Sequence, residues 1–128
     1  MADKKLILLV DDDPDFVEAV RVIVENGGYE VEVAYDGQEG LEAVAERKPD
    51  LIVLDVMMPV MNGHEACAKL KGSEETADIP IILLTAVADR VTTSTYTHRD
   101  MLESEAEDYM PKPVEPGELL ERIQSWVS

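Results

Sequence analysis

The fold is decided by the segment Leu-Ile-Leu-Leu-Val-Asp-Asp-Asp (residues 6–13), in which a continuous apolar run ends abruptly in three aspartates. A run that is apolar at every position is typical of a parallel strand with both faces covered, and its acidic end marks the loop that follows. Asp13 and Pro14 then match an N-cap and an N1 proline, and apolar residues recur at helical spacing until Gly27. We therefore predict a strand over residues 6–10 and a helix directly after it.

The same strand-then-helix unit recurs along the rest of the chain. Further strands are predicted at residues 29–34, 51–54, 80–84 and 108–110. The last helix is predicted from an apolar stripe that includes Leu119, Ile123 and Trp126. Repeated units of this kind predict an α/β protein with a flavodoxin-like, doubly wound parallel sheet of five strands. The expected strand order is 2-1-3-4-5, with helices on both faces.

The length and the net charge of the chain limit the number of domains and the kinds of partner that it can have. A chain of 128 residues is typical of one domain, so we expect a single domain spanning residues 1–128. The net charge of −17 repels the phosphates of nucleic acids and of anionic membranes, so we expect neither as a partner. Cys67 is the only cysteine, and no apolar run approaches the roughly 20 residues that span a bilayer. These features predict a cytoplasmic protein.

Polar residues follow four of the predicted strands at one edge of the sheet. Asp11 and Asp12 follow the first strand, Asp55 the third, Thr85 the fourth and Lys112 the fifth. Ligands of a doubly wound sheet bind beyond the carboxyl ends of its strands, where the strand order reverses, and the first and third strands flank that point. The three aspartates are therefore expected to share one pocket.

Three carboxylates in one pocket require a cation. At about 4–5 Å and an effective dielectric constant of about 20, each pair of carboxylates costs roughly 3–4 kcal/mol. Carboxylate oxygens are ligands that Mg²⁺ prefers, and Lys112 supplies a second positive charge that can reach a phosphate oxygen. Thr85 supplies a hydroxyl donor. This set predicts phosphoryl transfer onto Asp55, with catalysis by positioning and charge neutralisation.

Four segments resemble the receiver domain of bacterial two-component response regulators. They are Leu-Leu-Val-Asp-Asp-Asp (8–13), Leu-Asp-Val-Met-Met-Pro-Val-Met-Asn-Gly (54–63), Leu-Leu-Thr-Ala (83–86) and Asp-Tyr-Met-Pro-Lys-Pro (108–113). The similarity covers essentially the whole chain. Four such motifs in this order, each at the end of a strand, are specific to that family.

The resemblance implies that Asp55 accepts a phosphoryl group from a histidine kinase or a phosphotransfer protein. It further implies that Mg²⁺ is bound by Asp12, Asp55 and the backbone carbonyl of Met57, with Asp11 acting through a metal-bound water. Such a protein catalyses only its own phosphorylation and dephosphorylation, so we do not expect an enzyme in the ordinary sense.

The resemblance also implies a conformational switch. Thr85 and Lys112 are expected to contact the phosphoryl oxygens, and Tyr109 matches the aromatic residue that moves inward as the threonine hydroxyl turns towards the phosphate. The output surface is expected on the fourth helix, the last strand and the last helix. A downstream protein partner is expected to read this surface, and the chain is expected to be a monomer or a phosphorylation-dependent dimer.

One region departs from the family pattern. Between Thr85 and Lys112 lie 26 residues, a few more than the family usually has, and within the region 88–105 the segment 92–98 is poor in helix formers. We predict that the region of the fourth helix is lengthened or partly irregular. Such a change would alter the output surface and therefore the partner.

Two other classes of function compete with this interpretation. A magnesium-dependent phosphatase of the haloacid dehalogenase type also places a nucleophilic aspartate after its first strand, here Asp11 followed by Asp13. In this chain, however, Pro14 stands where that family has Thr or Val, and Asp55 would have no role. The second alternative is a receiver that docks without phosphate, and the presence of every site residue argues against it.

Overall fold

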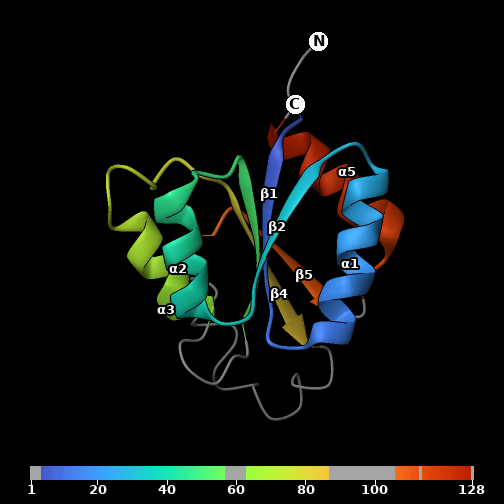
Figure 1. Cartoon of the computed structure of the whole chain (residues 1–128), viewed down its shortest axis with the longest axis horizontal. Helices are drawn as coiled ribbons and strands as arrows, with labels where there is room; N and C mark the ends of the chain where they lie inside the picture. Colours follow the sequence, from blue (N-terminus) through green and yellow to red (C-terminus); the bar gives the residue numbers. More distant parts are fainter. Residues whose placement is uncertain (1–3, 57–62, 87–105, 113, 128) are drawn as a thin grey trace.

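The computed structural model describes residues 4–56, 63–86, 106–112 and 114–127. Within these ranges, five short strands form one parallel sheet in the order β2-β1-β3-β4-β5 (Figure 1). The strands are β1 (Leu6–Val10), β2 (Glu30–Ala34), β3 (Leu51–Asp55), β4 (Ile81–Ala86) and β5 (Asp108–Lys112). The helices in these ranges are α1 (Pro14–Asn26), α2 (Gly37–Glu46), α3 (Gly63–Lys71) and α5 (Pro116–Val127). The predicted fold class and strand order are confirmed.

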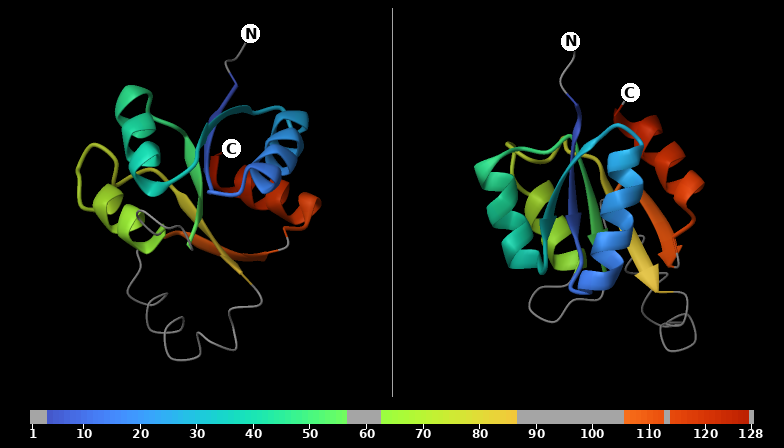
Figure 2. Two further views of the ribbon diagram at one scale, coloured as in Figure 1. Left: turned by 60° about the horizontal axis from the view of Figure 1, so that its bottom comes forward. Right: turned by 45° about the vertical axis from the view of Figure 1, so that its right-hand side comes forward.

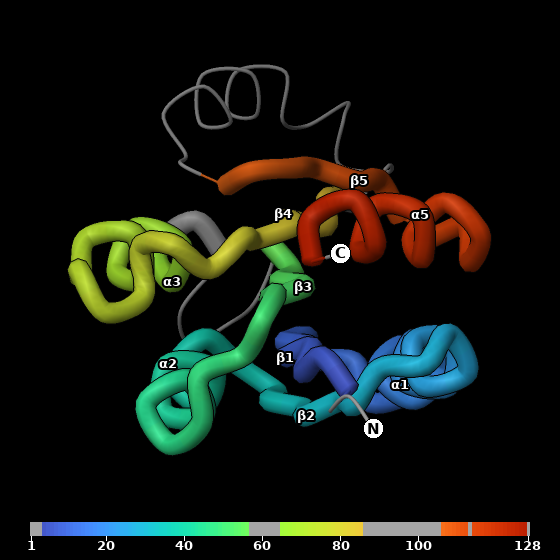
Figure 3. Tube along the Cα trace, turned by 90° about the horizontal axis from the view of Figure 1, so that it is seen from above, coloured from blue at the N-terminus to red at the C-terminus, as the bar shows by residue number. Residues whose placement is uncertain are grey.

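Helices cover both faces of the sheet (Figure 3). Helices α1 and α5 pack on one face, where the core includes Ile7 and Leu9, and α2 and α3 pack on the other, where it includes Leu8 and Val10. Side chains of a strand alternate between the two faces, so covering both faces buries every residue of β1. This arrangement explains why the first strand is apolar at every position.

The start of α1 shows how the chain turns at the carboxyl end of β1. The Asp13 carboxylate is the N-cap and accepts hydrogen bonds from the backbone N–H groups of Asp15 and Phe16. Pro14 occupies the first position of the helix, where no intrahelical N–H bond is needed. The predicted N-cap and the predicted end of this helix before Gly27 are both confirmed.

The last two strands are longer than predicted. Strand β4 continues through Ala86, so Thr85 lies inside the strand instead of following it, and β5 continues past residue 110 to Lys112. In the register of the sheet, Thr85 pairs with Pro111 and Ala86 with Lys112. A proline in the sequence usually indicates the end of a strand. Pro111 is tolerated within β5 because that strand lies at the edge of the sheet.

The apolar stripe of α5 is only partly buried. Leu119 and Ile123 are buried against the sheet, whereas Trp126 is 42% exposed. The indole N–H of Trp126 donates to the Asp108 carboxylate at 3.2 Å, at the edge strand β5. Trp126 therefore lies on the apolar stripe of α5 but outside the buried core.

The carboxyl ends of the strands meet at one edge of the sheet, as the arrows in Figure 2 show. Residues 88–105 and Met57, for which predictions were made, lie outside the described ranges. Each helix in those ranges is too short or too polar to span a bilayer.

Candidate functional site

An acidic cluster lies at the carboxyl ends of β1 and β3. Asp11 follows β1 and is fully buried, Asp55 is the last residue of β3 and is 3% exposed, and Asp12 lies at the surface. One carboxylate oxygen from each of the three lies within 4.8 Å of the others. The three aspartates that the sequence singled out thus share one site.

Lys112 brings a positive charge into this cluster from the end of β5. Its Nζ donates to Asp11 Oδ2 at 2.8 Å and lies 3.2 Å from Asp55 Oδ1. The lysine side chain is 23% exposed. The ammonium therefore bridges two buried carboxylates that come from different strands.

The carboxylates keep Lys112 charged. Burial by itself lowers the pKa of this lysine, but the hydrogen bond to Asp11 and the charges of Asp55 and Asp11 outweigh it and raise the pKa above its ordinary value of 10.5. At neutral pH the site therefore contains a permanent cation.

The net charge of the site suits a divalent cation. The formal charges of the three aspartates and of Lys112 give the site a net charge of −2. All three carboxylate groups offer oxygen, the ligand atom that Mg²⁺ prefers. The residues present therefore fit a magnesium ion in donor type and in charge.

The backbone around Asp11 holds its carboxylate in place. Asp11 Oδ1 accepts a hydrogen bond from the N–H of Asp13 at 3.0 Å, while Oδ2 accepts from Lys112. The N–H of Asp11 itself donates to the carbonyl of Ala34 at the end of β2. The carboxylate is thus oriented by the loop that leads into α1.

Thr85 and Tyr109 come from the two neighbouring strands. Thr85 is partly buried in β4, one residue beyond Leu84, which pairs with Asp55. Tyr109 is partly buried in β5 and packs against the core on the α2 and α3 face, and its carbonyl accepts from Arg122 at 2.9 Å. The structure places Thr85 at the same sheet edge as the acidic cluster, and Tyr109 three residues earlier on the strand that carries Lys112.

Sequence reasoning missed Phe16. The Lys112 Nζ lies over the face of the Phe16 ring, 4.3 Å from its centroid. In the sequence, Phe16 reads only as one more apolar residue of α1, because nothing local links it to a lysine near the other end of the chain. Its position in the first turn of a helix that begins beside the acidic cluster is the one available signal.

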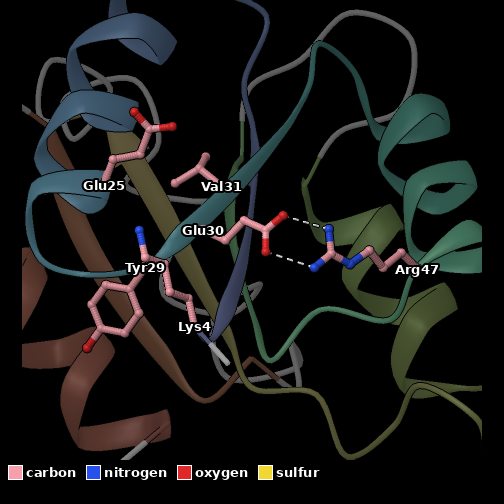
Figure 4. Close-up of a pocket in the computed structure, with 6 residues that line it drawn as sticks. All are labelled: Lys4, Glu25, Tyr29, Glu30, Val31 and Arg47. Carbon is pink, nitrogen blue, oxygen red and sulfur yellow. Dashed lines mark hydrogen bonds and ion pairs between the residues drawn. The ribbon is translucent and has the colours of Figure 1, made fainter. Parts of the chain in front are cut away.

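A surface pocket lies away from this site, beside the amino end of β2 (Figure 4). It is lined by Lys4, Glu25, Tyr29, Glu30, Val31 and Arg47. The Arg47 guanidinium donates two hydrogen bonds to the Glu30 carboxylate, both at 2.8 Å. Because the Arg47 guanidinium is already paired with the Glu30 carboxylate, we assign no ligand or reaction to this pocket.

Comparison with known proteins identifies the family. Residues 7–124 match the model of the response regulator receiver domain, and the chain therefore belongs to that family. It is 37% identical over 122 residues to the DNA-binding dual master transcriptional regulator RpaA of Synechocystis, covering 93% of this chain and 47% of RpaA. The chain spans about half the length of the curated relatives it matches.

Solved receiver structures agree with this assignment. The chemotaxis protein CheY4 of Vibrio cholerae is 30% identical with a TM-score of 0.85, and the alignment covers 97% of this chain and 99% of CheY4. The receiver domain of the sensor histidine kinase PA1611 of Pseudomonas aeruginosa, with magnesium coordinated in its active site cleft, is 27% identical with a TM-score of 0.86, over 98% of both chains. Membership in this family disfavours the phosphatase alternative.

Proposed function

We propose that this receiver works as a phosphorylation switch in which Asp55 is the phospho-acceptor. The observation that carries the proposal is the Lys112 ammonium bridging the buried carboxylates of Asp11 and Asp55 at the carboxyl edge of the sheet. The donor is a phosphohistidine of a histidine kinase or a phosphotransfer protein. We also propose that residues 1–128 form a single domain.

In the proposed reaction, an Asp55 carboxylate oxygen forms a bond to phosphorus while the P–N bond to the donor imidazole breaks. The imidazole leaves and takes up a proton, and Asp55 becomes an acyl phosphate. Lys112 moves from its carboxylate partners to a phosphoryl oxygen, where its charge offsets the charge of the transferred group. Attack by water on phosphorus later breaks the bond to the Asp55 oxygen, releases inorganic phosphate and restores the carboxylate. The domain therefore turns over only its own phosphoryl group.

We propose Mg²⁺ as the cofactor. Asp12 and Asp55, with the backbone carbonyl of Met57, would bind the ion, and Asp11 would act through a metal-bound water. A bound Mg²⁺ supplies positive charge that offsets the carboxylates and the phosphoryl oxygens. The charge of −2 on the cluster and the magnesium coordinated in the similar PA1611 receiver support this proposal.

We propose that the signal leaves the site through β5. The Thr85 hydroxyl would turn towards a phosphoryl oxygen, and Tyr109 would move inward in response. The proposed output surface comprises the fourth helix, β5 and α5. Arg122 of α5 donates to the carbonyl of Tyr109 and to the carboxylate of Asp108, which supports mechanical coupling between β5 and α5.

The proposed partners are a kinase or phosphotransfer protein upstream and a protein downstream. We also propose a cytoplasmic location and either a monomer or a phosphorylation-dependent dimer. The net charge of −17 supports the view that this domain itself contacts neither nucleic acid nor membrane. RpaA is described as DNA-binding, and this chain matches only about half of RpaA.

Intact-mass measurement tests the proposal. The wild type, Asp55→Asn and the control Asp15→Asn are each incubated with acetyl phosphate, with and without Mg²⁺. The wild type and the control, which changes an exposed aspartate of α1, are expected to gain about 80 Da only with Mg²⁺. The Asp55→Asn variant is expected to gain nothing.

Two results would contradict the proposal. A gain that survives Asp55→Asn would point to Asp11 and to phosphatase-like chemistry. No gain in a folded wild type, with acetyl phosphate, phosphoramidate and a panel of histidine kinases, would favour the docking-only alternative.

A further inference from the structure

Four residues near the site form a closed ring of contacts. Lys112 Nζ donates to Asp11 Oδ2, and Asp11 Oδ1 accepts from the N–H of Asp13. The Asp13 carboxylate accepts in turn from the N–H of Phe16, and the Phe16 ring lies under the Lys112 ammonium. The N-cap residue Asp13 is thus connected to the acidic cluster by two routes. One route is its contact with Asp11, and the other passes through Phe16 to Lys112.

The ring of Phe16 completes the surroundings of the ammonium. Lys112 approaches Asp11 at 2.8 Å and Asp55 at 3.2 Å, and its Nζ lies 4.3 Å from the ring centroid. An ammonium over an aromatic face is attracted by the negative face of the ring, and the attraction is stronger where water is excluded. Phe16 itself packs against the core on the α1 and α5 face, so its ring has a fixed support.

We propose that Phe16 is a positioning residue of the receiver, whose aromatic face holds the Lys112 ammonium beside Asp11 and Asp55 for phosphoryl transfer. This inference rests on the proposed role of Asp55 as the phospho-acceptor. It gives a partly buried residue of α1 a role in the reaction that is not evident from its place in the apolar stripe of that helix.

Two effects of opposite sign follow. A lysine has a long, flexible stem, and without the aromatic face Lys112 loses one of the contacts that keep it at the cluster. Phosphoryl transfer should then slow. Magnesium and Lys112 compete for the same carboxylates, so a less firmly held lysine should leave Mg²⁺ binding equal or slightly tighter. Damage to the fold would weaken both properties together.

The chain offers an unusually direct test, because Phe16 is its only phenylalanine. Growth on 3,4,5-trifluorophenylalanine therefore changes this one side chain, weakening the negative face of the ring with little change in its shape. Phe16→Leu removes the ring, and Phe16→Tyr is the matched control that keeps it. For each protein we would measure the initial rate of phosphorylation by acetyl phosphate, the Mg²⁺ affinity by calorimetry and the NMR shift of the Lys112 ε-methylene protons.

The expected result is a three- to tenfold slower phosphorylation in the fluorinated protein and in Phe16→Leu, which is the size of effect a cation–π contact produces. Phe16→Tyr should phosphorylate within about twofold of the wild type. Mg²⁺ affinity should stay equal or rise in the two slow proteins. The ε-methylene protons of Lys112 should show an upfield ring-current shift in the wild type and in Phe16→Tyr, and lose it in Phe16→Leu.

Wild-type rates in both the fluorinated protein and Phe16→Leu would overturn the proposal, since Phe16 would then be a packing residue only. Equal losses in Phe16→Tyr and Phe16→Leu would overturn it as well. The absence of any phosphorylation, wild type included, would defeat the proposed function instead. In that case the Lys112 proton shift and the change in Mg²⁺ affinity still decide whether Phe16 positions the lysine.

Discussion

The buried ammonium of Lys71 donates a hydrogen bond to the Glu107 carboxylate at 2.7 Å, across 36 positions of sequence. The other Glu107 oxygen accepts from the N–H of Ile81 at 2.8 Å, and Lys71 also donates to the carbonyls of Ala77 and Ile79. This network joins the end of α3 to the starts of β4 and β5. It lies at the end of the sheet opposite the acidic cluster.

Removing the Glu107 carboxylate should destabilise the fold. Glu107→Ala leaves the Lys71 side chain, which is only 4% exposed, without its counter-charge, and leaves Ile81 N–H without that acceptor. We expect a loss of about 2–3 kcal/mol in the free energy of unfolding, measured by urea denaturation. Glu107→Gln keeps an acceptor for Ile81 and should lose about half as much.

The control for this series is Glu121→Ala, which removes an exposed glutamate of α5 and should change stability by less than about 0.5 kcal/mol. An equal loss in Glu107→Ala and in the control would show that the Lys71 network adds nothing to stability.

Lys112→Met should destabilise the magnesium-free protein more than the magnesium-loaded one. The substitution leaves two buried carboxylates, Asp11 and Asp55, without their shared cation, for an expected loss of about 2–4 kcal/mol. Saturating Mg²⁺ should recover a large part of this loss, because the ion binds the folded state and supplies positive charge. Thermal unfolding with and without MgCl₂ measures both quantities.

Lys48→Met serves as the control, since Lys48 pairs with Asp78 at the surface and contributes little. If Mg²⁺ stabilised Lys112→Met no more than it stabilises the wild type, the lysine and the metal would not share the carboxylates.

Asp12→Asn should weaken Mg²⁺ binding without unfolding the protein. Asp12 is exposed and has one oxygen within 4.8 Å of oxygens from Asp11 and Asp55. We expect at least a tenfold loss of Mg²⁺ affinity by calorimetry, since one charged ligand becomes a neutral amide. Asp36→Asn, at the N-cap of α2, removes the same charge from a residue outside the three-aspartate cluster, and should leave the affinity within about twofold. Comparable losses in both variants would indicate a general effect of net charge.

The ion pair beside the pocket in Figure 4 predicts a dependence on acid pH. The hydrogen bond from Arg47 is the main cause that lowers the pKa of Glu30 below its ordinary value of 4.5. A lowered carboxyl pKa stabilises the fold above the unfolded pKa, and this stabilisation is lost as the pH falls through the folded value. The affected range therefore lies below pH 4.5.

An NMR titration of the Glu30 side-chain carboxyl carbon measures this shift. Its midpoint should lie below 4.5 in the wild type and rise towards that value in Arg47→Met. The same midpoint in both proteins would mean that the Arg47 contact does not persist in solution.

Trp126 should report on phosphorylation at a distance. It is the only tryptophan, and its indole N–H donates to Asp108, whose carboxylate also accepts from the N–H of the proposed switch residue Tyr109. Movement of β5 should therefore alter the environment of the indole. We expect acetyl phosphate with Mg²⁺ to change the Trp126 emission in the wild type and to leave it unchanged in Asp55→Asn. An unaltered emission in fully phosphorylated protein would contradict signalling through this end of β5.

Much of the fold could be predicted from local patterns. The boundaries of β1 and α1 agree with the prediction, because a run that is apolar at every position, an N-cap and an N1 proline are all signals within the local sequence. The predicted ends of β4 and β5 differ from the observed ends, because pairing between the two strands extends both of them past Thr85 and Pro111. Pro111 is tolerated in β5 because an edge strand can lack one N–H donor, and the sequence around this proline does not show that β5 lies at the edge.

Local sequence patterns are enough to predict that the acidic residues lie together, because strands of a parallel sheet bring their carboxyl ends to one edge. How these residues pair depends on the tertiary structure. The contact between Asp11 and Lys112 joins residues 101 positions apart, and the contacts of Phe16 with Lys112 and of Lys71 with Glu107 likewise cross the chain. Such contacts depend on strand register and on which elements lie side by side, and these are set by the packing of the whole sheet and its helices.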